Sequence, residues 1–355
     1  MIRIRRGLRR FRRLFWRAGK PAKAKPKMTP DQRAFRYIWH YLTVGSDNRS
    51  PLSLGQQNVL ILQMGKVASH SIQTALGERG INAFHSHGLS DPVQLGVLSG
   101  LFGRDVTFRL VAHDLRRHIQ NVAMQMMVRW YECHKHHRGR KLKVITLVRD
   151  PVTHYPSSFL HRRDIAKPRI MAWERARSSL PPEHPVDEAQ AMLNLVMEAA
   201  SIIAEGRPST DAAGHSRCIA VARERWPEHP VIASEVGGWL TPLRWFDGEI
   251  TATFGVDMLA APELRERGWA ARSNDWVDVL IVKFEELKLL LPDVSRFVGV
   301  DALTLPAPKP SSAKEGAAEI MRAVRLMLET PVGQACAREL RTSRYGLACG
   351  YDRLG

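Results

Sequence analysis

A loop of small residues follows an apolar run near the start of the chain and has the composition of an anion-binding loop. The apolar run covers residues 59–62, the loop reads GKVASHS at residues 65–71, and a helical pattern covers residues 70–79. Small residues let backbone N–H groups approach a ligand closely, and the N-terminus of a following helix adds positive charge, as does Lys66. The candidate anion-binding residues are Lys66, Ala68, Ser69, His70 and Ser71.

This loop differs from the Walker A loop of nucleoside triphosphate-binding proteins. Leu60 stands where that loop has its first glycine, and Val67 stands where it has the Ser or Thr that binds magnesium. We therefore expect the loop to bind a phosphate-like group without an obligatory metal. A strand, a turn and a helix with an exposed lysine are the alternative interpretation of the same segment.

A second candidate anion site follows the apolar run at residues 144–148. Arg149 comes directly after this run, and Ser157 lies eight residues further on, in a segment that we expect to be helical. A guanidinium can bind two phosphate oxygens at once, and a serine hydroxyl can donate to another. Two such sites on neighbouring loops would suit a nucleotide with phosphates at both ends. A structural pair between Arg149 and Asp150 is the alternative.

The elements that must position these residues alternate along the chain. Predicted strands cover residues 59–62, 144–148 and 277–282, and predicted helices include residues 70–79, 115–132 and 186–205. Short apolar strands separated by helices indicate an α/β protein with a central parallel sheet flanked by helices. In such a sheet the loops at the carboxyl ends of the strands form the site. We expect four parts: a basic tail and linker at 1–27, an N-terminal helix at 28–50, the α/β domain at 51–305, and C-terminal helices packing on it at 306–355.

Positive charge is concentrated in the N-terminal tail. The 355-residue chain carries a net charge of +18, but residues 1–27 contain 12 Lys and Arg and no acidic residue, so the remainder carries only +6. Apolar residues recur in the tail at helical spacing, which suits a helix lying on an anionic membrane surface. A solvated basic tail, a nucleic-acid-binding tail and a cleaved organelle presequence are the alternatives. No specific nucleic acid is expected as a partner, because the rest of the chain has no comparable basic stretch.

Cysteine usage and hydropathy indicate the compartment. The chain has four cysteines and no CxxC pair, which is too few for a secreted disulfide framework. No apolar run reaches the length of a spanning helix, and the N-terminus lacks the apolar core of a secretory signal. We expect a cytoplasmic protein that is at most peripheral at the inner face of the membrane.

The motifs together resemble those of the sulfotransferase superfamily, whose donor is 3′-phosphoadenosine 5′-phosphosulfate (PAPS). The loop at residues 65–71 is similar to the donor loop of heparan sulfate 2-O-sulfotransferases. The family's second motif, Arg-(Asn/Asp)-Pro with a later Ser, is matched by Arg149, Asp150, Pro151 and Ser157. Weaker matches are the run FEEL at residues 284–287 and a segment at residues 245–257 that resembles a bacterial group of capsular polysaccharide synthesis proteins.

This resemblance implies a P-loop-like sulfotransferase fold and a role for each motif. Lys66 and the backbone around residues 68–71 would hold the 5′-phosphosulfate, and Arg149 and Ser157 would hold the 3′-phosphate. His70 departs from the family pattern, which has Thr or Ser there. The implied reaction moves a sulfuryl group from PAPS to a hydroxyl acceptor, with a polysaccharide as a candidate, and no metal is expected.

Such a transfer needs a cation at the leaving group and a base at the acceptor. Negative charge grows on the oxygen that joins phosphate to sulfate, and we assign its stabilisation to Lys66. Histidine is the side chain best suited to accept the proton of a hydroxyl near neutral pH. His87 and His113 are equal candidates, with His85 behind them, and a core or surface histidine is the alternative for each. We expect Glu285 to make a structural hydrogen bond.

Two further clusters invite functional interpretations. Residues 134–137 read HKHH, but adjacent ligands rarely converge on one metal ion and the neighbouring cations would repel it, so we expect a basic loop. Tryptophans between residues 226 and 276 could stack on sugars or form ordinary core. These tryptophans are Trp226, Trp239, Trp245, Trp269 and Trp276.

Two other functions stand as alternatives to sulfuryl transfer. A nucleotide-dependent phosphotransferase is disfavoured because no Ser or Thr follows Lys66 and no clear magnesium-binding carboxylate ends a predicted strand. The second alternative is a non-catalytic protein that keeps a relic of the same fold and associates with a membrane or with RNA.

Overall fold

The structure is a computed structural model that describes most of the chain from residue 58 onward. The described ranges are 58–65, 68–90, 108–133, 141–160, 163–181, 183–209, 213–306 and 316–354, with the side chains of residues 108–120 and 165 set aside. The basic tail, the expected N-terminal helix, Lys66 and the HKHH segment lie outside these residues. No helix in the described ranges is both long enough and apolar enough to cross a membrane.

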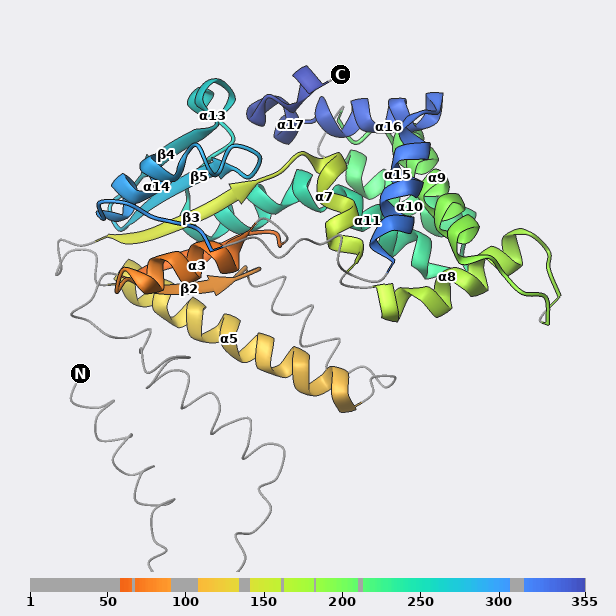
Figure 1. Ribbon diagram of the computed structural model, residues 1–355, viewed down its shortest axis with the longest axis horizontal. Coiled ribbons are helices and arrows are strands. Elements are labelled where there is room, and N and C mark those ends of the chain that lie inside the picture. Colours follow the sequence, from red (N-terminus) through yellow and green to blue (C-terminus); the bar gives the residue numbers. More distant parts are fainter. Residues whose placement is uncertain are drawn as a thin grey trace, which may run out of the picture.

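A five-stranded sheet forms the centre of the protein (Figure 1). Its strands are β1 (Asn58–Leu62), β2 (Asn82–Ser86), β3 (Leu142–Val148), β4 (Trp269–Ser273) and β5 (Val277–Lys283), in the order β2-β1-β3-β5-β4. All neighbouring strands are parallel except β4, which runs antiparallel to β5. The predicted α/β class, with a mostly parallel central sheet flanked by helices, is confirmed, and the three predicted strands are β1, β3 and β5. The two edge strands β2 and β4 were not predicted.

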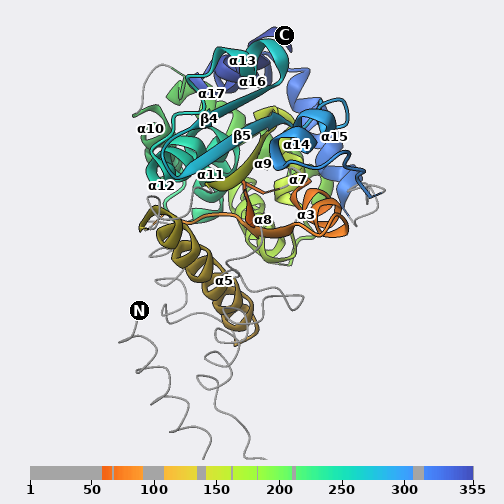
Figure 2. The same cartoon turned by 90° about the vertical axis from the view of Figure 1, so that its left-hand side faces the viewer.

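Helices cover both faces of the sheet. On one face, α3 (Ser69–Glu78) and α14 (Leu291–Val298) pack Ile72, Leu76 and Val294 against Ile61 of β1 and Ile145 of β3. On the other face lie α5 (Phe108–Cys133), a π-helical turn η1 (Phe246–Thr251), α12 (Ala252–Phe254) and α17 (Arg344–Cys349). Helix α5 extends well beyond the sheet edge (Figures 1 and 2). The sheet is therefore buried on both faces, as its continuous apolar strands predict.

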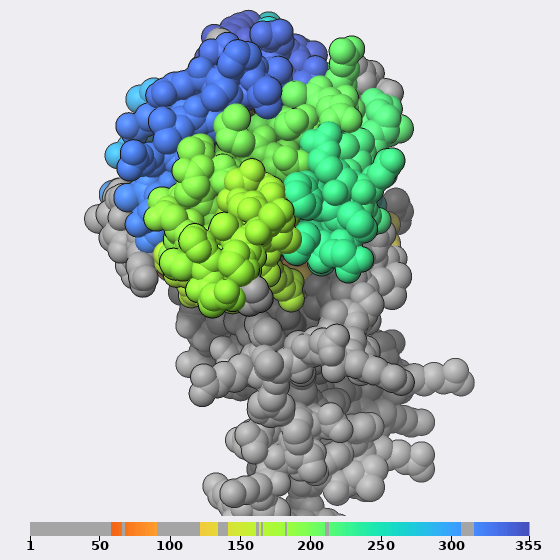
Figure 3. Space-filling view, turned by 90° about the vertical axis from the view of Figure 1, so that its right-hand side faces the viewer, coloured from red at the N-terminus to blue at the C-terminus, as the bar shows by residue number. Residues whose placement is uncertain are grey.

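A separate helical layer stands at the carboxyl ends of the strands, with its own apolar core. It contains α7 (Pro151–Phe159), α8 (Arg163–Arg177), α9 (Glu188–Gly206), α10 (Gly214–Arg225), α11 (Pro230–Trp245), α15 (Ala317–Leu328) and α16 (Pro331–Arg341). The C-terminal helices α15 and α16 pack against α9, and Figure 3 shows them beside the chain segments of α8 to α11 on one face of the molecule. Two short helical elements complete the described chain: α13 (Pro262–Arg267) and η3 (Tyr351–Leu354).

The strand order places a topological switch point between β1 and β3. The chain leaves β1 toward β2 on one side through α3, and returns past β1 to β3 on its other side through α5. Ile61 of β1 pairs with His85 of β2 and with Ile145 of β3. In an open parallel sheet the connecting loops diverge at such a point and leave a crevice that binds ligands. The two predicted anion loops begin at the carboxyl ends of these two neighbouring strands.

Candidate functional site

The structure brings the loops after β1 and β3 into direct contact. His154 of α7 is 1% exposed, and its Nε2 atom lies 3.1 Å from the carbonyl oxygen of Gly65. Because a carbonyl oxygen only accepts, the Nε2 atom of His154 carries the proton and donates. A buried hydrogen bond therefore ties the first loop to the helix that carries Ser157.

The first loop has an uncommon backbone conformation where it enters α3. Gly65 has φ +96°, and Ala68, the N-cap residue of α3, has φ +62°. A left-handed conformation costs a residue with a Cβ roughly 1–2 kcal/mol, and strain of this kind clusters at ligand-binding loops. Ser69 is buried and Ser71 half-buried, whereas His70 is exposed. The large side chain of His70 is thus accommodated by facing outward.

Two histidines of the segment that ends β2 contact the same loop. His87 Nδ1 lies 3.1 Å from the Gln63 carbonyl oxygen, so in the neutral ring the proton is on Nδ1 and Nε2 is the basic nitrogen. His85 is 6% exposed, and its Nε2 accepts from the side-chain amide of Gln63 at 3.1 Å. The rings of His70, His85 and His87 form an edge-to-face series with centroids 4.9 and 4.4 Å apart. Of these two histidines, His87 presents Nε2 as its basic nitrogen, whereas His85 uses its Nε2 to support Gln63.

His113 lies inside α5, which begins at Phe108 rather than near residue 115 as predicted. The apolar residues 110–112, which directly precede His113, are therefore part of the helix. The structure describes only the backbone of His113, so the choice of His113 as a base stays a prediction, as does every role assigned to Lys66.

The second loop places the Arg149 guanidinium beside the Ser157 hydroxyl. The Nη1 atom of Arg149 donates to Ser157 Oγ at 3.0 Å, and the guanidinium lies over the Phe284 ring, 4.8 Å from its centroid. Burial lowers the pKa of Arg149 from its ordinary value, and Glu285 and Asp150 oppose this shift. A guanidinium and a neighbouring hydroxyl can both donate hydrogen bonds to one anion.

Three residues near the C-terminus hold this loop in place, and we name Arg341, Tyr345 and Tyr351 the C-terminal clamp. Arg341 binds both carboxylate oxygens of Asp150, at 3.2 and 3.0 Å. The Tyr345 hydroxyl accepts from the Arg149 backbone N–H at 2.9 Å and donates to its carbonyl oxygen at 2.7 Å. Burial raises the pKa of Tyr345 well above its ordinary value, so the hydroxyl keeps its proton for this contact.

Glu285 completes the clamp from the end of β5. Its carboxylate accepts from the Asp150 backbone N–H at 2.9 Å and from the Tyr351 hydroxyl at 3.0 Å. The expectation that Glu285 makes a structural hydrogen bond is confirmed. The clamp itself was missed: the sequence predicted only C-terminal helices within residues 306–355, and no local pattern indicates which side chains of this region reach the end of β3.

The tryptophan cluster is mainly core, which corrects the sugar-stacking interpretation for three of its members. Trp239 is fully buried and stacks on Tyr155 at 4.1 Å, while Trp245 and Trp276 are 7% and 8% exposed. Trp226 and Trp269 are half-buried. Within the described residues, no group of three or more His, Cys, Asp or Glu side chains is arranged to hold a metal ion.

Comparison with known proteins adds no family or relative to this description of the fold and the site. No family model, no curated protein and no solved structure matches it.

Proposed function

We propose that the protein is a sulfotransferase that moves a sulfuryl group from PAPS to a hydroxyl acceptor. The observation that carries this proposal is the hydrogen bond between His154 and Gly65, because it joins two anion-binding loops at the switch point of one sheet. A single nucleotide with phosphates at both ends matches that arrangement. The order and spacing of the two motifs in the sequence point to the same donor, and a P-loop-like sulfotransferase fold is part of the proposal.

Residues at the carboxyl ends of β1 and β3 would hold the two ends of this donor. Arg149 and Ser157 are already paired at 3.0 Å, and an entering 3′-phosphate would receive hydrogen bonds from both. The N-terminus of α3, with Ser69, His70 and Ser71 in its first turn, would face the 5′ end together with Lys66. The donor supplies, when bound, a sulfuryl group attached to its 5′-phosphate.

Two side chains would act on the reacting groups. Lys66 would stabilise negative charge on the oxygen that the sulfuryl group leaves. His87 would accept the acceptor's proton at Nε2, since Nδ1 is engaged with the Gln63 carbonyl and fixes the ring's orientation. The segment behind His87 is also fixed, because the Trp245 indole N–H donates to the His87 carbonyl oxygen at 3.2 Å.

Calorimetric titration with the desulfated nucleotide, 3′-phosphoadenosine 5′-phosphate (PAP), tests the proposal without knowledge of the acceptor. ADP, which lacks the 3′-phosphate, is the matched probe. Charged hydrogen bonds of this kind contribute about 1.5–3 kcal/mol, so Arg149→Ala should weaken PAP binding roughly 10- to 150-fold and leave ADP binding nearly unchanged. The control is Arg296→Ala, which removes an arginine whose side chain is 73% exposed on α14. A wild-type protein that does not prefer PAP over ADP would contradict the proposal.

A further inference from the structure

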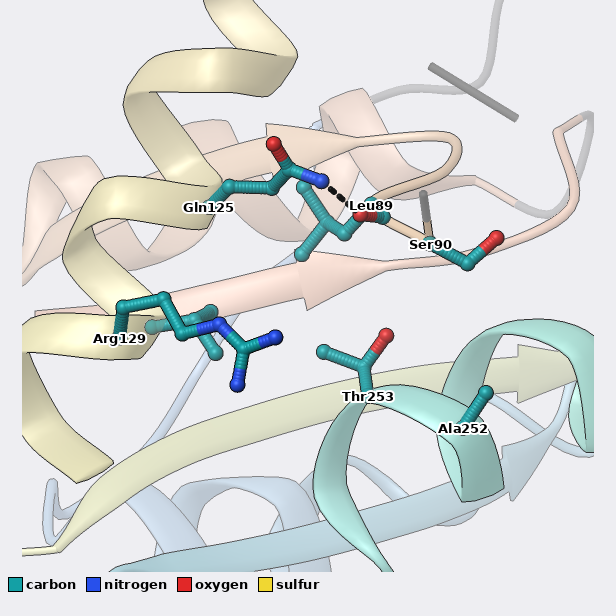
Figure 4. A pocket seen from close by; sticks show the side chains of 7 residues that line it. Leu89, Ser90, Gln125, Arg129, Ala252 and Thr253 are labelled. Carbon is teal, nitrogen blue, oxygen red and sulfur yellow. Dashed lines mark hydrogen bonds between the residues drawn. The ribbon is translucent and has the colours of Figure 1, made fainter. Parts of the chain in front are cut away.

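Helix α5 is held to the sheet through its C-terminal half and extends past the sheet edge (Figure 2). Asn121 accepts from the Ser86 hydroxyl at 2.8 Å, and Gln125 donates to the Leu89 carbonyl oxygen, the bond drawn in Figure 4. The apolar side chains of α5 that join the core under the sheet also come from this half: Ala123, Met124, Met127 and Val128. Seven residues earlier, the same face of the helix carries Arg116, Arg117 and Gln120. The face that packs on the sheet therefore turns polar toward the N-terminus of α5.

A second apolar line runs along another side of α5, and we name it the α5 seam. Its members follow one another at alternating intervals of four and three residues: Phe108, Ala112, Leu115, Ile119, Val122 and Met126. Positions with this spacing form one narrow stripe of a helix, the kind that packs against a second helix. The structure describes the side chains of two members: Val122 is half-buried and Met126 is 49% exposed, and neither belongs to an apolar core cluster of the described residues. The seam therefore lacks a helix partner within the described part of the chain.

The residues beside the seam indicate which partner fits it. Arg109, Arg116 and His118 occupy positions next to the seam, and no acidic residue stands at the other flanking positions. In an antiparallel pair of two copies, Arg109 and Arg116 would lie against their counterparts, and like charges at such positions are unfavourable. A helix that lies on a membrane presents a broader apolar face than this seam. The seam thus fits a helix that has an apolar stripe of the same spacing and no cations beside it.

Residues 31–43 of this chain, which precede β1, carry such a stripe. Phe35, Ile38 and Leu42 follow one another at intervals of three and four residues. The positions beside this stripe are uncharged: Gln32, Ala34, Trp39 and Tyr41. A helix of this length is only marginally stable by itself in water, because helix nucleation is costly, so it needs a surface that buries its apolar side.

The path of the chain brings this segment to α5. The side-chain amide of Asn58, the first residue of β1, donates to the Tyr131 hydroxyl of α5 at 3.2 Å. Residues 44–57 join residue 43 to this point, and a linker of that length spans at most about 50 Å. Helix α5 has 26 residues and is about 39 Å long, so residues 31–43 can reach the whole seam. A segment tethered in this way has an effective concentration of about millimolar, far above that of a second copy in solution.

We propose that the α5 seam is the docking surface for residues 31–43, which form a helix along it. The apolar residues of this segment would lie between those of the seam, at the shallow crossing angle of helices that pack in this way, about 20°. The inference is independent of the proposed sulfuryl transfer. It adds a helix over α5 and makes the segment before β1 part of the folded protein.

Amide hydrogen exchange of the full-length protein, measured by mass spectrometry, tests this docking, because each variant can be read on the opposite element. Leu115→Asp places a carboxylate in the seam and should speed exchange in residues 31–43 by about tenfold or more, the loss of one buried leucine. Met126→Asp changes an exposed position of the seam. It should act in the same direction and leave the apolar core of the described fold intact.

The reciprocal variant is Ile38→Asp, which should speed exchange in residues 108–120. The controls are Arg117→Asp and Tyr37→Asp, which introduce the same carboxylate at positions outside the two stripes. Arg117→Asp should leave the exchange of residues 31–43 unchanged, and Tyr37→Asp should leave that of residues 108–120 unchanged.

In the wild type, the amides of residues 31–43 should exchange more slowly than those of an unstructured chain, and exchange at the unstructured rate would overturn the proposal. Unchanged exchange of these residues in both Leu115→Asp and Met126→Asp would overturn it as well. Sedimentation, and flotation with vesicles of phosphatidylcholine and phosphatidylserine, identify other occupants of the seam. If Met126→Asp loses a dimer or loses vesicle binding while residues 31–43 exchange as in the wild type, the seam binds a second copy or lipid instead, and the proposal is wrong.

Discussion

The two anion loops at the switch point are held by different means. The loop after β1 depends on neutral contacts to its own backbone, from His87 to the Gln63 carbonyl and from His154 to the Gly65 carbonyl. The loop after β3 depends on the C-terminal clamp, which includes an ion pair between the buried Asp150 and the half-buried Arg341, 191 positions apart in the chain. The first loop is therefore held by neutral hydrogen bonds from histidines 24 and 89 residues away in the chain, and the second is held by a charged pair.

This difference predicts different failures on mutation. Removal of one partner from a buried ion pair leaves an uncompensated charge and costs about 3–5 kcal/mol, whereas a neutral hydrogen bond contributes about 0.5–1.5 kcal/mol. Damage to the clamp should therefore reduce the stability of the whole fold. Damage to the first loop should affect donor binding more than the free energy of unfolding.

The largest effect is expected for Arg341→Ala. Asp150 is 2% exposed, so loss of Arg341 leaves its carboxylate buried without its cation. The free energy of unfolding in urea should fall by about 3–5 kcal/mol. The control is Arg344→Ala. Arg344 lies three residues further along and pairs with Asp247 and Asp257, and all three side chains are more than 40% exposed. This variant should lose less than about 1 kcal/mol in the free energy of unfolding. Equal losses in the two variants would show that the clamp is no more important than a surface pair.

Only part of this comparison was accessible from the sequence. Strands β1, β3 and β5 were predictable because burial on both faces requires continuous apolar runs. Edge strand β2 was missed because polar residues fill three of its four buried positions. Two of them make specific hydrogen bonds: Asn82 donates to Asn58 at 2.7 Å, and Ser86 donates to Asn121 at 2.8 Å. The apolar pattern of a sequence does not display such specific hydrogen bonds.

The residues of the candidate site also divide into those that the sequence indicated and those that it did not. Arg149 and Ser157 were found because their spacing within one segment forms a motif, and the structure places them 3.0 Å apart. Tyr345 and Tyr351 were not found, because nothing near them in the sequence indicates that their hydroxyls reach the ends of β3 and β5. Likewise His154 sits among ordinary residues of α7, and its role depends on the position of a loop 89 residues earlier.

A smaller effect, confined to the first loop, is expected for His154. The substitution His154→Ala removes the donor to the Gly65 carbonyl and should weaken PAP binding by about 1–3 kcal/mol, roughly 5- to 150-fold. His154→Gln places an amide N–H in a comparable position and should recover most of the affinity, which a role in packing alone would not. Calorimetric titration of both variants with PAP makes the measurement. If the two variants bind PAP equally well, the bridge between the loops does not position the donor site.

The smallest effect is expected for Gly65→Ala. This substitution tests the backbone conformation of the first loop without removing a side-chain contact. A Cβ at Gly65 would meet the His87 ring at 3.7 Å, an ordinary contact, so the cost is that of a positive φ, about 1 kcal/mol in the free energy of unfolding. Gly80 has φ +74° with nothing within 4 Å of its would-be Cβ, so Gly80→Ala should lose a similar amount. Only Gly65→Ala should also weaken PAP binding, because relaxation of its backbone moves the loop that faces the donor. If the two variants are equally destabilised and both bind PAP like the wild type, the conformation of Gly65 serves folding alone. The first loop would then depend on His87 and His154 rather than on its own backbone.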